Sequence, residues 1–187
     1  MSKDLIKQFR EKAEAVSAEV FIASDLPGAL GLALDWLRKE QKTKITADDR
    51  IAGLLAGREL SGLGLVFPDR PEKFAELQAA LVEADFGVAE TGTLVHLDAT
   101  PRDLWRWTLP ENCLAFIDRR KIAASMEELL EAFNAYLSSG QAEGEGSPAN
   151  EVKQISFVTG PSRTADIEGQ LELGVHGPLR LLIFIYG

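Results

Sequence analysis

Short β-like runs alternate with helical segments along most of this chain, and this alternation constrains the fold more than any other feature. Runs of branched and aromatic residues, such as 113–117 and 179–186, are typical of strands. Between such runs, apolar residues recur at spacings of three and four, which is typical of amphipathic helices. Strands that alternate with helices usually form a largely parallel sheet. We therefore expect an α/β fold with a mostly parallel sheet flanked by helices.

The chain is expected to begin with an amphipathic helix within residues 1–17, followed by a single α/β domain over residues 18–187. Glycine in Glu90–Gly92 separates two β-like runs, which predicts one antiparallel pair. Residues 138–150 contain Gly, Ser, Glu and Pro with nothing apolar larger than Ala, which favours a mobile loop over a lid. The expected strands cover 18–23, 44–46, 63–67, 85–89, 93–97, 113–117, 154–159 and 179–186, and the expected helices cover 3–17, 29–42, 51–60, 73–83, 103–107 and 125–136.

Charge and hydropathy exclude several classes of partner. The 187 residues carry a formal net charge of −9, so the sequence offers no clustered basic surface for nucleic acid or an anionic membrane. No apolar run approaches the roughly 20 residues that cross a bilayer. Charges throughout the first ten residues argue against a signal peptide, so we expect a cytoplasmic protein.

Cysteine and histidine are too few for the common metal centres. The single cysteine, Cys113, excludes an internal disulfide and an iron–sulfur cluster or cysteine-rich zinc site made by this chain alone. The two histidines do not stand at a metal-binding spacing. No P-loop or Gly-x-Ser-x-Gly motif is present. We therefore expect no metal and no cofactor bound by this chain.

The stretch from Gly160 to Pro178 carries the strongest functional pattern. A strand is expected to end in a Gly-Pro turn, and a short helix to begin at Ser162, which is a good N-cap. The first N–H groups of that helix and the Arg163 guanidinium together suit a carboxylate or phosphate. The alternative is a tight connection whose arginine pairs with a nearby acid. The predicted anion-binding residues here are Gly160, Pro161, Ser162, Arg163, Thr164, Asp166, Gly174, His176 and Gly177.

Two further groups are candidates for catalysis. Glu90 follows a strand and precedes Thr91 and Gly92, which are predicted to bind ligand, so Glu90 can serve as base or nucleophile. The alternative is a plain hairpin with a solvated glutamate. His176 lies in a turn and can do acid–base work, or hydrogen-bond the backbone. His96 alternates within a strand and is expected to be structural. Because ligands bind at the carboxyl ends of strands, these segments are expected to meet there.

Two motifs resemble one family. Gly-Pro-Ser-Arg-Thr-Ala-Asp-Ile-Glu at 160–168, with Leu-Gly-Val-His-Gly-Pro at 173–178, is similar to the signature of the lactate-utilisation protein C (LutC/YkgG) family, the LUD domain. Ala-Glu-Thr-Gly-Thr-Leu-Val at 89–95 resembles that family's second motif. The resemblance implies a fold similar to the NagB/RpiA/CoA-transferase-like group, which includes the ribose-phosphate isomerases.

The same resemblance implies a role in L-lactate conversion to pyruvate, alongside partner proteins that carry iron–sulfur clusters. This reading makes the chain an accessory subunit that binds a small anion or docks a partner. A second hypothesis is a small enzyme acting on a hydroxy acid, sugar phosphate or CoA ester, with Glu90 as base or nucleophile. A third is a ligand sensor with the same pocket and no turnover.

Overall fold

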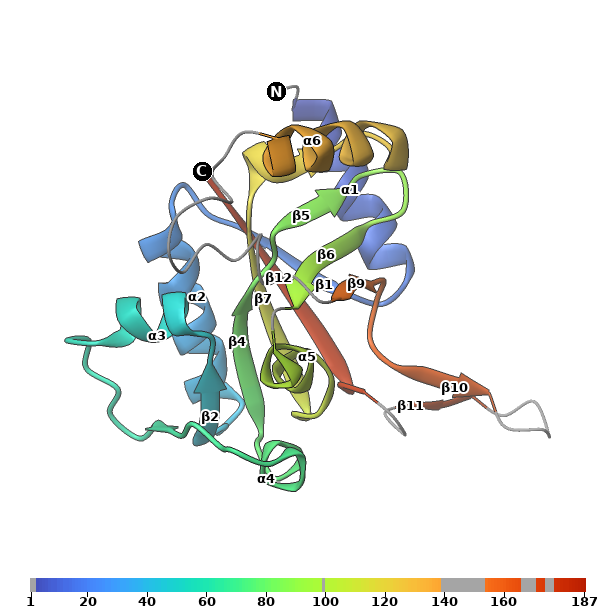
Figure 1. The fold of residues 1–187 in the computed structure, drawn as a ribbon. Helices are drawn as coiled ribbons and strands as arrows, with labels where there is room; N and C mark the ends of the chain where they lie inside the picture. The colour runs from blue at the N-terminus through green and yellow to red at the C-terminus, as the bar shows by residue number, and fades with distance from the viewer. Residues whose placement is uncertain (1–2, 99, 139–153, 166–170, 174–176) are drawn as a thin grey trace.

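A six-stranded parallel sheet forms the centre of the protein (Figure 1). The computed structural model describes residues 3–98, 100–138, 154–165, 171–173 and 177–187. The strand order is β1-β12-β7-β4-β2-β3, and every pairing within this sheet is parallel. The prediction of an α/β fold with a mostly parallel sheet is confirmed. The strands are β1 (Glu19–Ile22), β2 (Lys44–Ala47), β3 (Gly64–Leu65), β4 (Ala79–Glu83), β7 (Asn112–Asp118) and β12 (Arg180–Tyr186).

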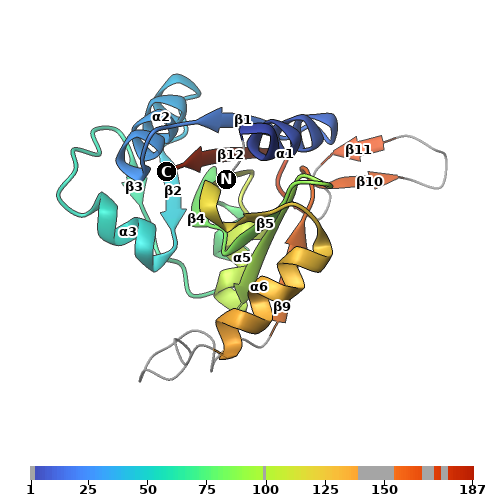
Figure 2. The ribbon, with the colours of Figure 1, turned by 90° about the horizontal axis from the view of Figure 1, so that it is seen from above.

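Helices cover both faces of this sheet because each face carries a continuous apolar surface. On one face, α2 (Leu26–Lys39) and α3 (Asp49–Leu55) pack against residues such as Leu81 and Phe184. On the other face lie α1 (Lys3–Ala15) and α5 (Pro101–Thr108), which bury Phe9 and Trp107. The short helix α4 (Pro71–Ala75) precedes β4. The view from above shows α2 and α3 on the side of the sheet away from α1 and α5 (Figure 2).

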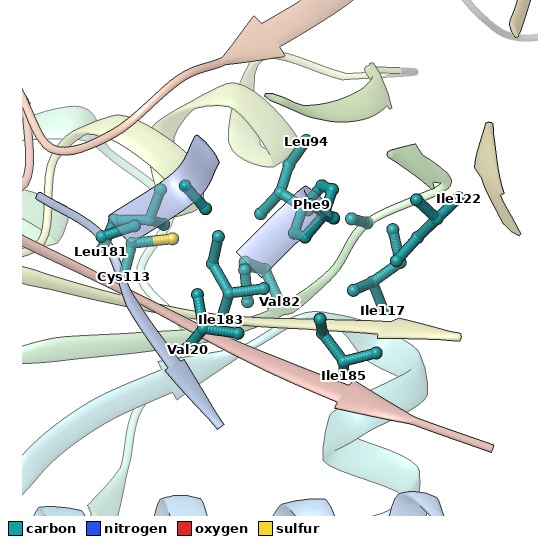
Figure 3. Packing of buried hydrophobic residues seen from close by; sticks show 14 of the residues in the cluster. Phe9, Val20, Val82, Leu94, Cys113, Ile117, Ile122, Leu181, Ile183 and Ile185 are labelled. Atoms are coloured by element: carbon teal, nitrogen blue, oxygen red, sulfur yellow. The ribbon is translucent and has the colours of Figure 1, made fainter. Parts of the chain in front are cut away.

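The apolar cluster on the face that α1 and α5 cover joins elements from both halves of the chain. Phe9 of α1 packs with Val82 of β4, Ile117 of β7 and Ile183 of β12 (Figure 3). These side chains are at most 1% exposed. Burial of this kind stabilises a fold by roughly 25 cal/mol per Å² of apolar surface. The N-terminal helix is therefore part of the core.

A second, four-stranded sheet lies over this cluster, in the order β8-β5-β6-β9. Strands β5 and β6 pair in antiparallel fashion, as the glycine between them predicts. Helix α6 packs on the far side through Leu129. The elements are β5 (Phe86–Val88), β6 (Thr93–Asp98), the 3₁₀ turn η1 (Arg119–Lys121), β8 (Ile122–Ala123), α6 (Met126–Ser138) and β9 (Gln154–Val158). Residues 139–150, the greater part of the predicted mobile loop, lie outside the described residues.

The helix predicted over residues 73–83 is wrong in its second half. The structure ends α4 at Ala75 and places Ala79–Glu83 in β4, between β2 and β7. Alanine, leucine and glutamate favour helices in isolation. All five β4 residues are buried, because neighbouring strands and layers enclose them on every side. Such a strand lacks the polar–apolar alternation that identifies strands in a sequence.

The helix predicted to begin at Ser162 is also wrong. The Ser162 N–H donates to the Pro178 carbonyl at 3.0 Å, and the chain continues as β10 (Arg163–Ala165). Strand β10 pairs with β11 (Leu171–Leu173) in a two-stranded antiparallel sheet, which projects from the body (Figure 1). A helix start has no partner for its first N–H groups. Here the Pro178 carbonyl accepts the hydrogen bond from the Ser162 N–H. The residues after Ser162 pair with β11 and form a strand in place of a helix.

Smaller differences concern the ends of elements. The third helix spans 49–55 where 51–60 was expected, and β3 is only two residues long. Asp48 caps this helix, since its Oδ1 accepts a hydrogen bond from the Ile51 N–H at 2.8 Å. Among the residues that the structure describes, no helix is long and apolar enough to cross a membrane.

The sheet has a topological switch point between β2 and β4. These strands are parallel neighbours. The chain leaves β2 into α3, on the face that α2 covers, and leaves β4 into β5, on the opposite face. Two neighbouring strands whose connections go to opposite faces leave a crevice at their carboxyl ends, where ligands bind in open α/β sheets.

Candidate functional site

The segments singled out from the sequence do meet, at the C-terminal end of α1. We call this region the α1 junction; it comprises residues 90–93, 159–162 and 177–178. The Thr93 hydroxyl lies 2.7 Å from the Thr91 hydroxyl and 2.8 Å from that of Thr159. The Ser162–Pro178 hydrogen bond ties the second segment to the third. The junction lies at one end of the small sheet, and the Gly177–Pro178 turn precedes β12 at the amino end of the main sheet.

Glycines at the α1 junction face protein backbone. Gly92 has φ +68°, and a Cβ there would lie 2.3 Å from the Ala13 nitrogen. Gly160 has φ +73°, and its Cβ would lie 2.4 Å from the Val16 carbonyl oxygen. Both positions need a residue that adopts positive φ and has no side chain. The glycines therefore let α1 approach the two loops closely.

The remaining predicted site residues are placed as follows. Glu90 is exposed, and its N–H donates to the Ala124 carbonyl at 3.1 Å. Pro161 is buried, and Gly177 lies against the Ser162 side chain. The backbones of Arg163 and Thr164 belong to β10, and their side chains are not described. Asp166, Gly174 and His176 lie outside the described residues. Ligand binding and catalysis by these residues stay predictions.

A separate cleft opens over the switch point between β2 and β4. Its volume is about 830 Å³, which is within the range of ligand pockets. We call it the carboxyl-end cleft. Both faces of the sheet contribute to it, through α3 on one side and β6 and α5 on the other. It is lined by Asp48, Asp49, Arg50, Asp69, Glu83, Asp85, His96, Leu97, Thr100, Pro101, Arg102, Asp103, Trp105 and Arg106.

Asp48 lies between the ends of the two strands. Its Oδ1 caps α3, and its Oδ2 accepts from the Glu83 N–H at 2.5 Å. Burial raises the pKa of Asp48, and these two backbone N–H groups, together with the charges of Arg106 and His96, oppose that rise. Asp48 thus links the start of α3 to the end of β4.

Glu83 ends β4 and is only 8% exposed. Its Oε1 accepts from the Tyr186 hydroxyl at 2.9 Å and pairs with Arg50 and, at 3.7 Å, with Lys121. Its Oε2 is buried without a hydrogen-bond partner in the described part of the chain. Burial raises the pKa of Glu83. Burial likewise raises the pKa of Tyr186, and the carboxylate of Glu83 adds to that rise. A buried carboxyl with a raised pKa is a candidate for acid–base chemistry.

Arg106 forms the opposite wall. Its side chain is 11% exposed, and its Nη1 donates to Asp103 Oδ1 at 3.0 Å. Asp103 also accepts from Thr100, through the N–H at 2.7 Å and the hydroxyl at 2.9 Å, in the capping box of α5. The Arg106 Nε is buried with no hydrogen-bond partner among the described residues. The capping box at the start of α5 therefore holds the Arg106 guanidinium in place through Asp103.

A histidine and an aspartate stand beside this arginine. His96 Nδ1 lies 3.0 Å from Asp85 Oδ2, and the Leu97 N–H donates to the same oxygen at 2.8 Å. The His96 ring packs against the Trp107 ring with centroids 5.2 Å apart. His96 and Arg106 both line the carboxyl-end cleft.

Reading the sequence missed every residue of this cleft. The pattern of residues 73–83 predicts a helix and so conceals Glu83, and the alternating strand position of His96 indicates a structural side chain. One signal was available: Asp48, Glu83 and Asp85 each end or follow a strand of a parallel sheet. Nothing local shows that these strands are neighbours. Within the described ranges, no group of three or more His, Cys, Asp or Glu is placed to hold a metal ion.

Comparison with known proteins identifies the family. The sequence model of the LUD domain matches residues 6–186. This chain belongs to the LUD domain family. The resemblance carried by the two motifs is thereby confirmed for nearly the whole chain.

Several named relatives share part of this LUD domain. It is 32% identical to Lactate utilization protein C of Halalkalibacterium halodurans over 109 residues, 58% of this chain and 44% of that protein. It is 32% identical to Lactate utilization protein C 1 of Bacillus mycoides over 123 residues, 65% of this chain and 49% of that protein. It is also 32% identical over 110 residues to protein YkgG of Escherichia coli, which is uncharacterized. The LUD domain thus spans about half the length of these relatives.

A solved structure has the same fold. The crystal structure of a DUF162 family protein from Deinococcus radiodurans aligns with the LUD domain with a TM-score of 0.65. The alignment covers 100% of this chain and 99% of the other at 19% sequence identity. The likeness supports the parallel sheet and its flanking helices as the architecture.

Proposed function

We propose that this LUD domain is an accessory subunit in the oxidation of L-lactate to pyruvate. It acts with iron–sulfur partner proteins and binds a small anionic ligand. The observation that carries this proposal is the match to relatives named lactate utilization protein C at 32% identity. The carboxyl-end cleft supports ligand binding, because it sets a mostly buried arginine at a switch point of the sheet.

The chemistry of Cys113 supports placing the clusters on partner proteins. It is the only cysteine, and it is 1% exposed in the apolar cluster around Phe9 and Ile183. Burial raises the pKa of its thiol, whereas cluster ligands are thiolates. Electron transfer in this proposal therefore belongs to the partners.

Reconstitution tests the proposal. The full chain is added to the purified iron–sulfur lactate-utilisation proteins of the same cell, and L-lactate-dependent reduction of an artificial electron acceptor is followed. We expect the chain alone to be inactive, and to raise the activity of its partners. Co-purification through a tag on the chain should recover the same partners. If the chain neither changes the rate nor co-purifies with them, the proposal is wrong.

A second candidate function is favoured by the Asp85–His96 pair, which faces the cleft beside Arg106. The LUD domain would then itself be a small enzyme acting on an anionic substrate such as a hydroxy acid. The predicted base, Glu90, lies outside the cleft lining, so the two regions can be separated by mutation. Turnover by the isolated chain that survives Glu90→Gln and is lost in His96→Gln would assign the chemistry to the cleft.

A further inference from the structure

We propose that the carboxyl-end cleft binds a small zwitterion such as an amino acid, with Arg106 holding its carboxylate and Glu83 holding its ammonium group. Two polar atoms at the cleft are buried without hydrogen-bond partners among the described residues, and they are of opposite kinds. Glu83 Oε2 is an acceptor, and Arg106 Nε is a donor. The inference goes beyond the proposed function and does not depend on it, because it is drawn from the polar atoms of the cleft.

Arg106 has one edge of its guanidinium available for a carboxylate. Nη1 is taken, because it donates to Asp103 Oδ1 at 3.0 Å. The other edge consists of Nε and Nη2, whose two N–H groups match the two oxygens of a carboxylate. Nε has no partner in the described part of the chain, and Nη2 lies 3.7 Å from Asp49 Oδ1. The Asp49 side chain is 98% exposed, so it holds Arg106 weakly and a ligand carboxylate can replace it.

Glu83 has one carboxylate oxygen available for an ammonium group. Its described contacts are all made by Oε1, which accepts from the Tyr186 hydroxyl at 2.9 Å and pairs with Arg50 and Lys121. Oε2 has no partner in the described structure, although the side chain is only 8% exposed. Burial raises the pKa of Glu83, while the contacts of Oε1 oppose that rise and favour the charged form. An N–H donor from a ligand would satisfy Oε2.

The two side chains contact the same turn at the start of α3. Asp48 Oδ2 accepts from the Glu83 N–H at 2.5 Å, and Arg50 pairs with the Glu83 carboxylate. Asp49 stands between these two residues in the chain, and it is the residue that Arg106 approaches at 3.7 Å. Three consecutive residues thus connect Glu83 to Arg106, and both side chains line the cleft. A small molecule with two charged ends is therefore able to meet both.

The charge of the cleft favours a ligand with a positive group. Six acidic side chains and three arginines line the cleft, which gives a formal charge of −3 with histidine neutral. This charge favours a ligand that brings a cation together with its carboxylate over one that brings a carboxylate alone.

Access to Glu83 Oε2 requires a side chain to move. This oxygen is covered by protein, and the neighbouring Arg50 pairs with Oε1 of the same carboxylate. Arg50 is 58% exposed, and ion pairs of exposed side chains are weak, so its guanidinium can turn toward solvent. Movement of Arg50 admits the ammonium group while Glu83 keeps its hydrogen bond from Tyr186.

Calorimetry on the full chain at neutral pH tests the inference, with L-alanine, 4-aminobutyrate, propionate and propylamine as probes. The first two carry both charges at different spacings, and the last two carry one charge each. We expect at least one of the zwitterions to bind about tenfold or more tightly than either single-charge probe, because two charged contacts act together.

Single substitutions then remove each contact. Arg106→Gln should weaken binding of the zwitterion about tenfold or more and leave propylamine binding unchanged, and Arg106→Lys should recover only part of the loss. Glu83→Gln keeps the shape of the side chain but removes its charge. It should weaken binding of the zwitterion about tenfold or more and leave propionate binding near the wild-type value. The matched controls are Arg58→Gln and Glu90→Gln, two exposed residues outside the cleft lining, and both should bind as wild type.

Asp49→Asn tests the Arg106 edge without disturbing the core. The Asp49 side chain is 98% exposed, so the variant should fold as wild type. Removing the charge that competes for Arg106 should tighten propionate binding about twofold. Circular dichroism and the melting temperature of each variant show whether it is folded.

Each result either supports or overturns the inference. Tighter binding of a zwitterion that is lost in folded Arg106→Gln and Glu83→Gln supports it. Binding of neither zwitterion by wild type, or binding that both folded variants retain, overturns it. If Glu83→Gln does not fold, unchanged affinities in the Arg106→Gln and Asp49→Asn variants overturn it. If wild type binds neither zwitterion but raises lactate oxidation by its partners, this inference fails and the proposed function stands.

Discussion

The α1 junction and the carboxyl-end cleft differ in how their polar groups are satisfied. At the junction, three threonine hydroxyls bond one another, Gly92 lies against the backbone of α1, and Gly160 lies against Val16, which follows α1. At the cleft, Glu83 Oε2 and Arg106 Nε are buried without partners among the described residues, next to about 830 Å³ of open volume. The described hydroxyls of the junction have partners, whereas the cleft holds polar atoms that have none among the described residues.

This difference separates a signal in the sequence from a signal in the structure. Glycine and proline motifs mark places where the backbone turns or approaches another segment closely. Such a close approach occurs in packing as well as in ligand binding. Here Gly92 approaches Ala13 and Gly160 approaches Val16, so both glycines are explained by packing. Buried polar atoms without partners cost free energy, so their position at a cleft points more directly to a ligand.

The largest effect is expected at the junction glycines. Gly92→Ala and Gly160→Ala should each lower the free energy of unfolding by about 3 kcal/mol or more, because positive φ is combined with a backbone clash. Gly57→Ala is the matched control: its φ is +88°, but nothing lies within 4 Å of the added Cβ. It should cost about 1 kcal/mol. Urea unfolding measures all three. Equal costs at the three positions would mean that α1 does not press on the junction.

A smaller loss is expected when the hydroxyl chain is broken. Thr93→Val removes the central hydroxyl, which is 5% exposed and contacts those of Thr91 and Thr159. The free energy of unfolding should fall by about 1.5 kcal/mol. Thr91 is exposed and ends the row of hydroxyls, so Thr91→Val should lower the free energy of unfolding by less. A Thr93→Val variant as stable as wild type would show that the hydroxyls do not hold the junction together.

A gain in stability is expected when a hydroxyl is removed from β2. Thr46 in β2 is 0% exposed, and its Oγ1 has no hydrogen-bond partner in the described structure. Thr46→Val keeps the shape and removes the unsatisfied hydroxyl, so the free energy of unfolding should rise by about 1 kcal/mol. Chemical denaturation with the Thr93→Val variant in parallel gives the comparison. A loss of stability would indicate that the Thr46 hydroxyl does have a partner in solution.

The smallest effect is expected in the pH dependence of stability. Burial raises the pKa of Glu83 above its ordinary value of 4.5, so the folded state binds this proton more tightly than the unfolded state. Stability contributed by the protonated form is present below 4.5 and is lost as pH rises through the folded-state pKa. Glu83→Gln cannot titrate, so its stability relative to wild type should increase as pH rises through that window.

Glu90→Gln is the control for this titration, because Glu90 is exposed at the junction. Its stability relative to wild type should show no such rise. Denaturant unfolding at a series of pH values from acid to neutral measures both variants. If Glu83→Gln becomes less stable relative to wild type with rising pH, then the pairing of Glu83 with Arg50, Lys121 and Tyr186 outweighs its burial.

Much of the fold could be predicted because the elements carry local patterns. The apolar stripe of α1, the strands β7 and β12 and the β5–β6 hairpin all follow from spacing and composition. The errors lie where the surroundings decide. The residues of β4 favour a helix but are enclosed by strands on both sides, and Ser162 is a good helix cap whose N–H is taken by Pro178.

For the candidate site too, some features follow from local patterns and others follow from packing. Local patterns were enough to predict the α/β class, the family motifs and the meeting of the Glu90–Gly92 and Gly160–Ser162 segments. The packing of distant elements places Ala13 and Val16 against the glycines of those segments, and it brings Asp48, Glu83, Asp85, His96 and Arg106 to one cleft. Local patterns record which surface of an element is buried. They do not record which strands become neighbours, and the cleft exists only because β2 and β4 lie side by side and send the chain to opposite faces.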